Sequence, residues 1–380
     1  MSKTAFPIRP EILDFEEYSP GLSIEDIRRR FGLDRIIKMA SNENPLGVSP
    51  LALEAMRRHA AFAFRYPRGC APDLCAALAA YHRLPENCFV PGNGSDEIVD
   101  LLLRVCPSPG RHNVVACRSS FSMYRIASRL CGVEFRAVPR RDDFAFDYGM
   151  LLEAVDENTA LVFIASPDNP SGFCPPWEDL AALARALPSS CLLVLDEAYA
   201  DFCGDIAAHS LLPRFGEFGN LVVLRTFSKA FGLAGIRLGY GVMPERLADA
   251  LRSAHMPFSI SILAEAAGIA ALGDRDFYER TLSVVSEGRS FLTETLAGMG
   301  CTCFPSLANF LMFKPPAGRG TAVEIFEGLL ARGLIIRSLK SYGLPEHLRV
   351  SVGMPEENSL FINALRELIA CFSPQPARSA

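Results

Sequence analysis

The stretch RTFSKAFGLAGIRLGY, residues Arg225–Tyr240, carries the strongest functional signal in the chain. It follows an apolar run and places two hydroxyl groups, those of Thr226 and Ser228, just before Lys229. Arg237 lies eight residues further on. The protein has five lysines, and Lys229 is the only one between residues 39 and 313, so a lysine here is a specific choice.

A lysine desolvated at the end of a strand can lose its proton and form an imine with a carbonyl, which an arginine cannot do. Hydroxyl groups and a guanidinium group together offer the hydrogen bonds that a phosphate needs. The fragment around Lys229 therefore predicts a phosphorylated aldehyde cofactor, pyridoxal phosphate (PLP). A loop lysine beside an ion-paired arginine explains the fragment alone equally well, so the prediction depends on the rest of the chain.

Length and composition predict a soluble enzyme of two domains, since 380 residues with 49% hydrophobic residues exceed one typical core. The formal charge is −5, and no basic block could follow a nucleic-acid backbone. No apolar stretch is long enough to span a membrane, and the first ten residues lack the apolar core of a signal peptide. The twelve cysteines show no CxxC pair or zinc spacing, and the six histidines form no cluster. We therefore expect free thiols, a cytoplasmic location and no metal.

Short apolar runs alternate with amphipathic helical segments through the middle of the chain. Because the runs are apolar throughout, they predict a mostly parallel sheet covered on both faces. The expected strands are Asn113–Cys117, Val133–Val138, Ala160–Ala165, Cys191–Leu195, Leu221–Arg225 and Ile236–Val242. We expect a large domain over residues 41–274 and a smaller α+β domain over residues 275–372, where Cys301–Phe313 forms a strand. Residues 1–40 would pack on the small domain, and residues 373–380 would be a disordered tail.

In a sheet of this kind, chemistry gathers at the carboxyl ends of the strands. After one apolar run comes PGNGSDE, in which Gly94 permits close backbone approach, while Ser95 and Asp96 could open a helix. The N–H groups at such a helix start form an anion site, although a plain capped turn explains this loop too. Asn169 follows a second run, in SPDNPSG, and could donate to an oxygen anion or belong to an ordinary turn.

Asp196 stands directly beyond a third run, in LVLDEAY. A carboxylate at a buried strand end needs a cationic partner, which could be a pyridinium nitrogen or a structural arginine.

Taken together, the ordered motifs resemble those of the fold-type I PLP-dependent aminotransferases over nearly the whole chain. The resemblance implies a large α/β domain with a mostly parallel central sheet plus a smaller α+β domain. It implies that Lys229 bonds to the cofactor, Asp196 pairs with the pyridine nitrogen, Tyr199 and Asn169 contact the ring oxygen, and Phe121 stacks on the ring. The implied phosphate contacts are Gly94, Ser95, Asp96, Thr226, Ser228 and Arg237. The catalytic residues would be Lys229, Asp196 and Tyr199.

Within that superfamily the chain is most similar to the histidinol-phosphate aminotransferases. The resemblance rests on ASNENPLGVSP (residues 40–50), FRYPRG with Tyr66, and EYSPG with Tyr18. It implies a homodimer in which Tyr66 reaches the cofactor of the partner subunit. The implied substrate contacts are Tyr18, Asn42, Arg337 and Arg349. The implied reaction, in histidine biosynthesis, is amino transfer from glutamate to imidazole-acetol phosphate, giving histidinol phosphate and 2-oxoglutarate.

Four positions depart from the common pattern of this family. Glu17 stands where proline is usual, Arg68 where aspartate is common, Phe121 where tyrosine is frequent, and Asp168 where asparagine is common. These departures leave room for a shifted substrate preference, so an aromatic amino acid aminotransferase and a threonine-phosphate decarboxylase remain alternatives. A PLP-binding transcription regulator would need a basic helix-turn-helix before residue 40, and no such pattern is present.

Overall fold

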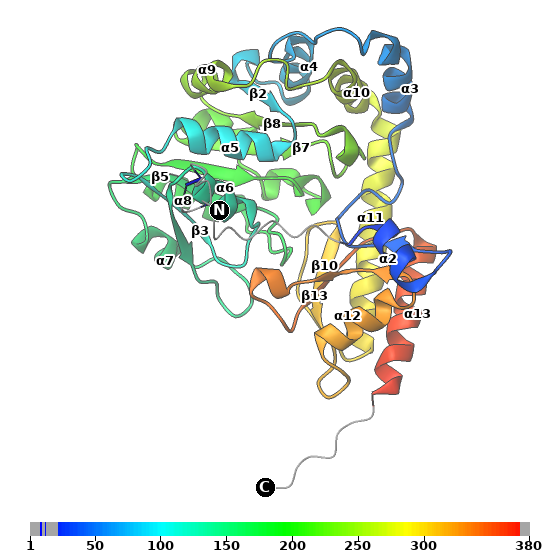
Figure 1. Cartoon of the computed structure of the whole chain (residues 1–380). Coiled ribbons are helices and arrows are strands. Elements are labelled where there is room, and N and C mark those ends of the chain that lie inside the picture. The colour runs from blue at the N-terminus through cyan, green and yellow to red at the C-terminus, as the bar shows by residue number, and fades with distance from the viewer. Residues whose placement is uncertain (1–7, 10–11, 13–21, 373–380) are drawn as a thin grey trace, which may run out of the picture.

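The computed structural model describes residues 8–9, 12 and 22–372. They form a large α/β domain and a smaller α+β domain, joined along one side by the long helix α11 (Arg275–Gly298), drawn in yellow in Figure 1. The predicted tail at residues 373–380 lies outside the described residues. Among those described, no helix is long and apolar enough to cross a membrane.

The large domain is built on a seven-stranded sheet with the strand order β2-β8-β7-β6-β5-β3-β4. Within the described residues, β8 is the one strand that runs against its neighbours, so the expected mostly parallel sheet is confirmed. The strands are β2 (Phe89–Gly92), β3 (Asn113–Cys117), β4 (Glu134–Val138), β5 (Thr159–Ala165), β6 (Leu192–Asp196), β7 (Leu221–Thr226) and β8 (Gly239–Val242). The expected strand Ile236–Val242 begins later than predicted, because Ala234–Ile236 forms a 3-10 turn and Arg237 adopts a φ of 57°.

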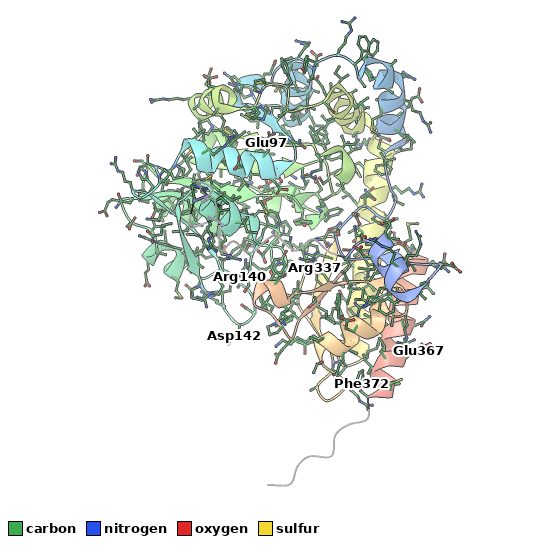
Figure 2. All side chains as sticks on the ribbon, in the orientation of Figure 1. Glu97, Arg140, Asp142, Arg337, Glu367 and Phe372 are labelled. Atoms are coloured by element: carbon green, nitrogen blue, oxygen red, sulfur yellow. The ribbon has the colours of Figure 1, made fainter. Side chains whose placement is uncertain are left out.

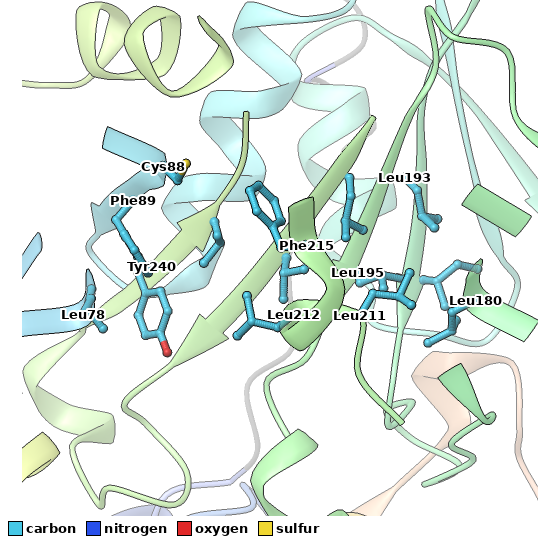
Figure 3. Close-up of a cluster of buried hydrophobic side chains, with 14 of the residues drawn as sticks. Leu78, Cys88, Phe89, Leu180, Leu193, Leu195, Leu211, Leu212, Phe215 and Tyr240 are labelled. Atoms are coloured by element: carbon cyan, nitrogen blue, oxygen red, sulfur yellow. The ribbon is translucent and has the colours of Figure 1, made fainter. Parts of the chain in front are cut away.

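Both faces of this sheet are buried, which explains the uninterrupted apolar runs. On β7, Leu221 and Val223 face one core, while Val222 and Leu224 face the other. Figure 3 shows part of the first core, where Leu193 and Leu195 of β6 pack beside Leu211. The first core is covered by α3 (Pro50–His59), α4 (Pro72–His82), α7 (Tyr148–Glu153), α8 (Trp177–Ala186) and α10 (Ile262–Gly273). The second core is covered by α5 (Ser95–Val105), α6 (Met123–Leu130) and α9 (Glu245–Ala254).

The small domain has a four-stranded sheet with the order β12-β13-β10-β9. The strands are β9 (Thr302–Cys303), β10 (Phe310–Lys314), β12 (Arg337–Ser338) and β13 (Leu348–Ser351), and the helices are α12 (Ala322–Leu330) and α13 (Pro355–Cys371). The single strand expected over Cys301–Phe313 was wrong: Phe313 pairs antiparallel with Cys303, so the chain reverses between them. Pro305, which cannot donate to a ladder, lies in the reversal.

The described part of the N-terminal segment packs on the small domain. Its helix α2 (Ile24–Phe31) places Ile27 in a cluster with Leu330. Its short strand β1 (Ile37–Lys38) pairs in parallel with β11 (Leu334–Ile335). The segment then crosses to the large domain: the Met39 N–H donates to the carbonyl oxygen of Ile335, and Asn44 Nδ2 donates to that of Ala230.

Candidate active site

A cavity of about 190 Å³ lies where the carboxyl ends of β5, β6 and β7 meet the start of α5. Most of the side chains predicted to bind a cofactor line it. These are Ser95, Asp96, Phe121, Asn169, Asp196, Tyr199, Thr226, Ser228, Lys229 and Arg237. The first and the last of these residues lie more than a hundred positions apart in the sequence. The parallel strands bring all of them to one edge of the sheet.

Lys229 follows β7 and holds its amine inside the cavity. Its Nζ donates to the carbonyl oxygen of Ser41 at 3.1 Å and lies 5.6 Å from the centre of the Tyr199 ring. Burial, followed by the positive charge of Arg349, lowers the pKa of Lys229 to about 8. A substantial fraction of the amine is therefore uncharged near neutral pH, as a nucleophile or base requires.

Asp196 ends β6 and is only 5% exposed. Burial raises the pKa of its carboxyl group to about 6, even though two hydrogen bonds oppose the shift. The Tyr124 hydroxyl donates to Oδ2 at 2.7 Å, and the Ala198 N–H donates to Oδ1 at 3.2 Å. The sequence analysis missed Tyr124. Tyr124 is the second residue of α6, and its ring stacks on that of Phe163 in β5.

One end of the cavity forms a cradle of hydrogen-bond donors. Gly94 caps α5 with a φ of 80°, and a Cβ added there would collide with the guanidinium of Arg237. Arg237 Nη2 also donates to Asp96 Oδ2 at 3.3 Å, while burial raises the pKa of the Asp96 carboxyl. Opposite them, the Ser228 N–H donates to Thr226 Oγ1 at 3.1 Å. A helix N-terminus, two hydroxyls and a guanidinium are the groups that hold a phosphate monoester, so the set fits PLP.

Two residues from other segments join the cavity wall through hydrogen bonds. Asn42 Nδ2 donates to the Tyr199 hydroxyl at 3.0 Å. Arg349, which is 4% exposed, donates to Asn169 Oδ1 and to the carbonyl oxygen of Ala40, the latter at 2.6 Å. Both Asn42 and Arg349 therefore lie beside the cavity, although neither stands in its immediate lining.

Three residues predicted for the site are not found in the cavity lining, and one of them lies outside the described residues. Arg337 is the partner of Arg349 in the β12–β13 pairing and lies outside the cavity lining. Tyr66 is 82% exposed, stacks on Phe258 with ring centres 4.9 Å apart, and does not line the cavity. Tyr18 lies outside the described residues.

The family model for class I and II aminotransferases matches residues 34–365. The chain is 56% identical to a histidinol-phosphate aminotransferase of Nitratidesulfovibrio vulgaris, over 95% of this chain and 96% of the relative. It is 41% identical to one of Akkermansia muciniphila, over 94% and 97% of the two chains. The crystal structure of histidinol-phosphate aminotransferase from Sinorhizobium meliloti in complex with PLP superposes with a TM-score of 0.89 at 30% identity, covering 98% of this chain and 100% of that one.

Proposed function

The chain belongs to the class I and II aminotransferases, and we propose that it transfers the amino group of glutamate to imidazole-acetol phosphate. The products would be histidinol phosphate and 2-oxoglutarate, in histidine biosynthesis. The observation that carries the proposal is a single cavity that contains a lysine amine, a buried carboxylate and a phosphate cradle. The relatives that share more than half of the sequence bear the name of this reaction.

The cavity residues would hold PLP at three points. The amine of Lys229 would bond to it, the cradle of Gly94, Ser95, Asp96, Thr226, Ser228 and Arg237 would bind its phosphate, and Phe121 would cover one ring face. Asp196 would face the ring nitrogen, while Tyr199 and Asn169 would contact the ring oxygen. The cofactor supplies an electron-withdrawing ring that makes the hydrogen on the substrate's α-carbon acidic.

Proton transfer would then depend on two groups of this chain. With a pKa of about 8, the Lys229 amine can accept the α-proton as a base and return it as an acid. Asp196, anionic above a pH of about 6, would hold a proton on the ring nitrogen through its negative charge. Tyr199, whose hydroxyl accepts from Asn42, would keep the ring oxygen in place.

The substrates of both half-reactions are anions, and arginines would select them. Arg349 has its guanidinium at the cavity wall, one hydrogen bond from Asn169. Arg337 stands opposite it on the neighbouring strand, where a second anionic group could bind. Asn42 and Tyr18, from the N-terminal segment, would complete the substrate pocket.

We further propose a homodimer in which Tyr66 contributes to the cavity of the partner subunit. Its support is an exposed aromatic patch, which we define as Phe62, Phe64, Tyr66 and Phe258, with exposed fractions from 47% to 82%. Apolar side chains gathered on one surface mark interaction sites. A cytoplasmic location also belongs to this proposal, and the twelve cysteines, all within the described residues, are free thiols that suit a reducing compartment.

A half-reaction measured by absorbance tests the substrate. The PLP-loaded protein is mixed separately with histidinol phosphate, phenylalanine and threonine phosphate, and the visible band of the bound cofactor is followed. Fast loss of the band with histidinol phosphate and slow loss with phenylalanine are expected. Equal or faster loss with phenylalanine would assign a broad or aromatic aminotransferase. Release of carbon dioxide from threonine phosphate would overturn the proposal.

A further inference from the structure

Asp168 occupies a buried position directly behind the candidate active site. It follows β5, immediately precedes Asn169, and is 0% exposed, yet it does not belong to the cavity lining. Its Oδ1 accepts from Ser120 Oγ at 2.7 Å and from Arg140 Nη2 at 2.6 Å. Its Oδ2 accepts from the Ser171 N–H at 3.2 Å and from Ser171 Oγ at 2.7 Å. The carboxylate thus accepts four hydrogen bonds from three separate segments.

Arg140 is the charged partner and is equally enclosed, with its side chain 4% exposed. Figure 2 shows it at the edge of the large domain nearest the small domain. Its Nε donates to the carbonyl oxygen of Arg118 at 3.2 Å, and its Nη1 donates to that of Phe144 at 3.1 Å. The guanidinium also lies 4.8 Å from the centre of the Phe146 ring. Arg140 therefore ties the loop after β3 to the loop after β5.

The residues next to this ion pair are the ones that line the cavity. Ser120, which donates to Asp168, precedes Phe121, and Asp168 itself precedes Asn169. We propose that the Arg140–Asp168 ion pair is a positioning pair, which fixes Phe121 and Asn169 relative to each other in the cofactor cavity. This inference rests on the proposed function for the roles of those two side chains.

The chemistry of the contacts explains why a carboxylate is needed here. All four groups that face Asp168 are donors, and a carboxylate is an acceptor at both oxygens. An asparagine would turn one oxygen into a donor, so either Arg140 or Ser171 would lose its partner. A buried ion pair adds little stability compared with a well-packed apolar pair, so fixing geometry is a better reason for it than stability.

The test compares Asp168→Asn with a matched control at the other end of the same strand. Asp156 precedes β5, accepts from Arg136 at 2.8 Å and from Asn113 at 3.0 Å, and lies outside the cavity. Hydrogen exchange of the cofactor-free proteins, measured by mass spectrometry, should rise at residues 118–124 and 166–172 in Asp168→Asn and stay unchanged there in Asp156→Asn. PLP affinity should fall about tenfold or more in the first variant alone.

Arg140→Gln provides a second route to the same result. This variant should raise hydrogen exchange at the same two segments. In the double variant, the rise in exchange should be little larger than in either single variant, because both changes break the same interaction. If Asp168→Asn only lowers the unfolding temperature, as Asp156→Asn does, with exchange at the two segments and PLP affinity unchanged, the pair is purely structural. If the wild-type protein fails to bind PLP, the proposed function fails, while the exchange comparison still decides the positioning role.

Discussion

The residues that surround the Lys229 amine set its pKa. Burial removes hydration and disfavours the charged form, and this is the largest effect on its pKa. Arg349 lowers the pKa further, while Glu43 raises it. The value of about 8 is thus the outcome of opposing charges that can be removed one at a time.

Replacing these charges should move the pKa of Lys229 in opposite directions. Arg349→Met removes a positive charge and should raise it, whereas Glu43→Gln removes a negative charge and should lower it. Competitive acetylation across a pH series, read by mass spectrometry in the cofactor-free protein, measures this. Lys3, Lys314 and Lys340 serve as an internal reference, whereas Lys38 is left out because it pairs with Glu43 at 3.0 Å. Shifts of the same sign in both variants would contradict the electrostatic account.

Gly94 is a second single residue with a specific requirement. In Gly94→Ala the new methyl group would displace the Arg237 guanidinium, and the φ of 80° would strain the helix start. We expect PLP affinity to fall about tenfold or more, because one charged phosphate contact is lost. Gly110→Ala is the matched control, since Gly110 has a φ of 73° with no atom near the added Cβ. It should lose some stability and bind PLP normally, as an equilibrium titration would report.

Among single residues, the sequence predicted those whose proposed role only one type of amino acid can fill. Only a lysine can form the imine, so Lys229 stood out within its motif, and the other motifs of the chain then supported its role. Tyr124 and Arg140 were missed, because nothing about a tyrosine or an arginine in those segments tells which carboxylate it will meet. Their partners, Asp196 and Asp168, lie 72 and 28 residues away in sequence and are fixed only by tertiary packing.

Among the elements, α6 and β6 meet at the hydrogen bond between Tyr124 and Asp196. Since this bond lowers the pKa of Asp196, Tyr124→Phe should raise that pKa above its value of about 6 and leave more of the carboxyl protonated at pH 7. In the proposed role of Asp196, PLP affinity depends on its ionised form, so the pH at which affinity falls to half should move upward by roughly one unit. Tyr148→Phe removes a buried hydroxyl that has no hydrogen-bond partner and should not shift this midpoint. An unchanged midpoint in Tyr124→Phe would refute the coupling.

The hydrophobic pattern of the sequence predicts a strand well where both faces of that strand are buried. The run at residues 113–117 became β3 with the expected bounds, because every residue of it packs into a core. The pattern failed at residues 301–313, where two short strands with an intervening reversal have the same apolar composition as one long strand. Pairing between strands, which composition does not encode, decides between the two.

Over the whole molecule, hydrogen bonds tie the cavity residues, which all belong to the large domain, to segments outside the cavity lining. Lys229 of the large domain donates to Ser41 of the connecting segment, and Arg349 of the small domain donates to Asn169 of the large one. The second bond crosses between the domains, so a substrate that binds Arg349 would also affect their relative placement. The sequence indicated which residues belong together through the resemblance to a family, whereas the cross-domain bonds required the structure.

The proposed homodimer extends this sharing to a second chain, and mixing two inactive variants tests it. Lys229→Ala removes the amine, and Tyr66→Ala removes the side chain that would cross the interface. In a mixed dimer, the subunit with an intact Lys229 receives an intact Tyr66 from the other subunit, so one of the two sites is native. Random exchange of subunits should therefore restore about a quarter of wild-type activity.

Each variant alone should stay inactive after the same treatment. Failure of the mixture to gain activity, when sedimentation shows mixed dimers, would place Tyr66 outside the partner's site and leave the aromatic patch a plain contact surface.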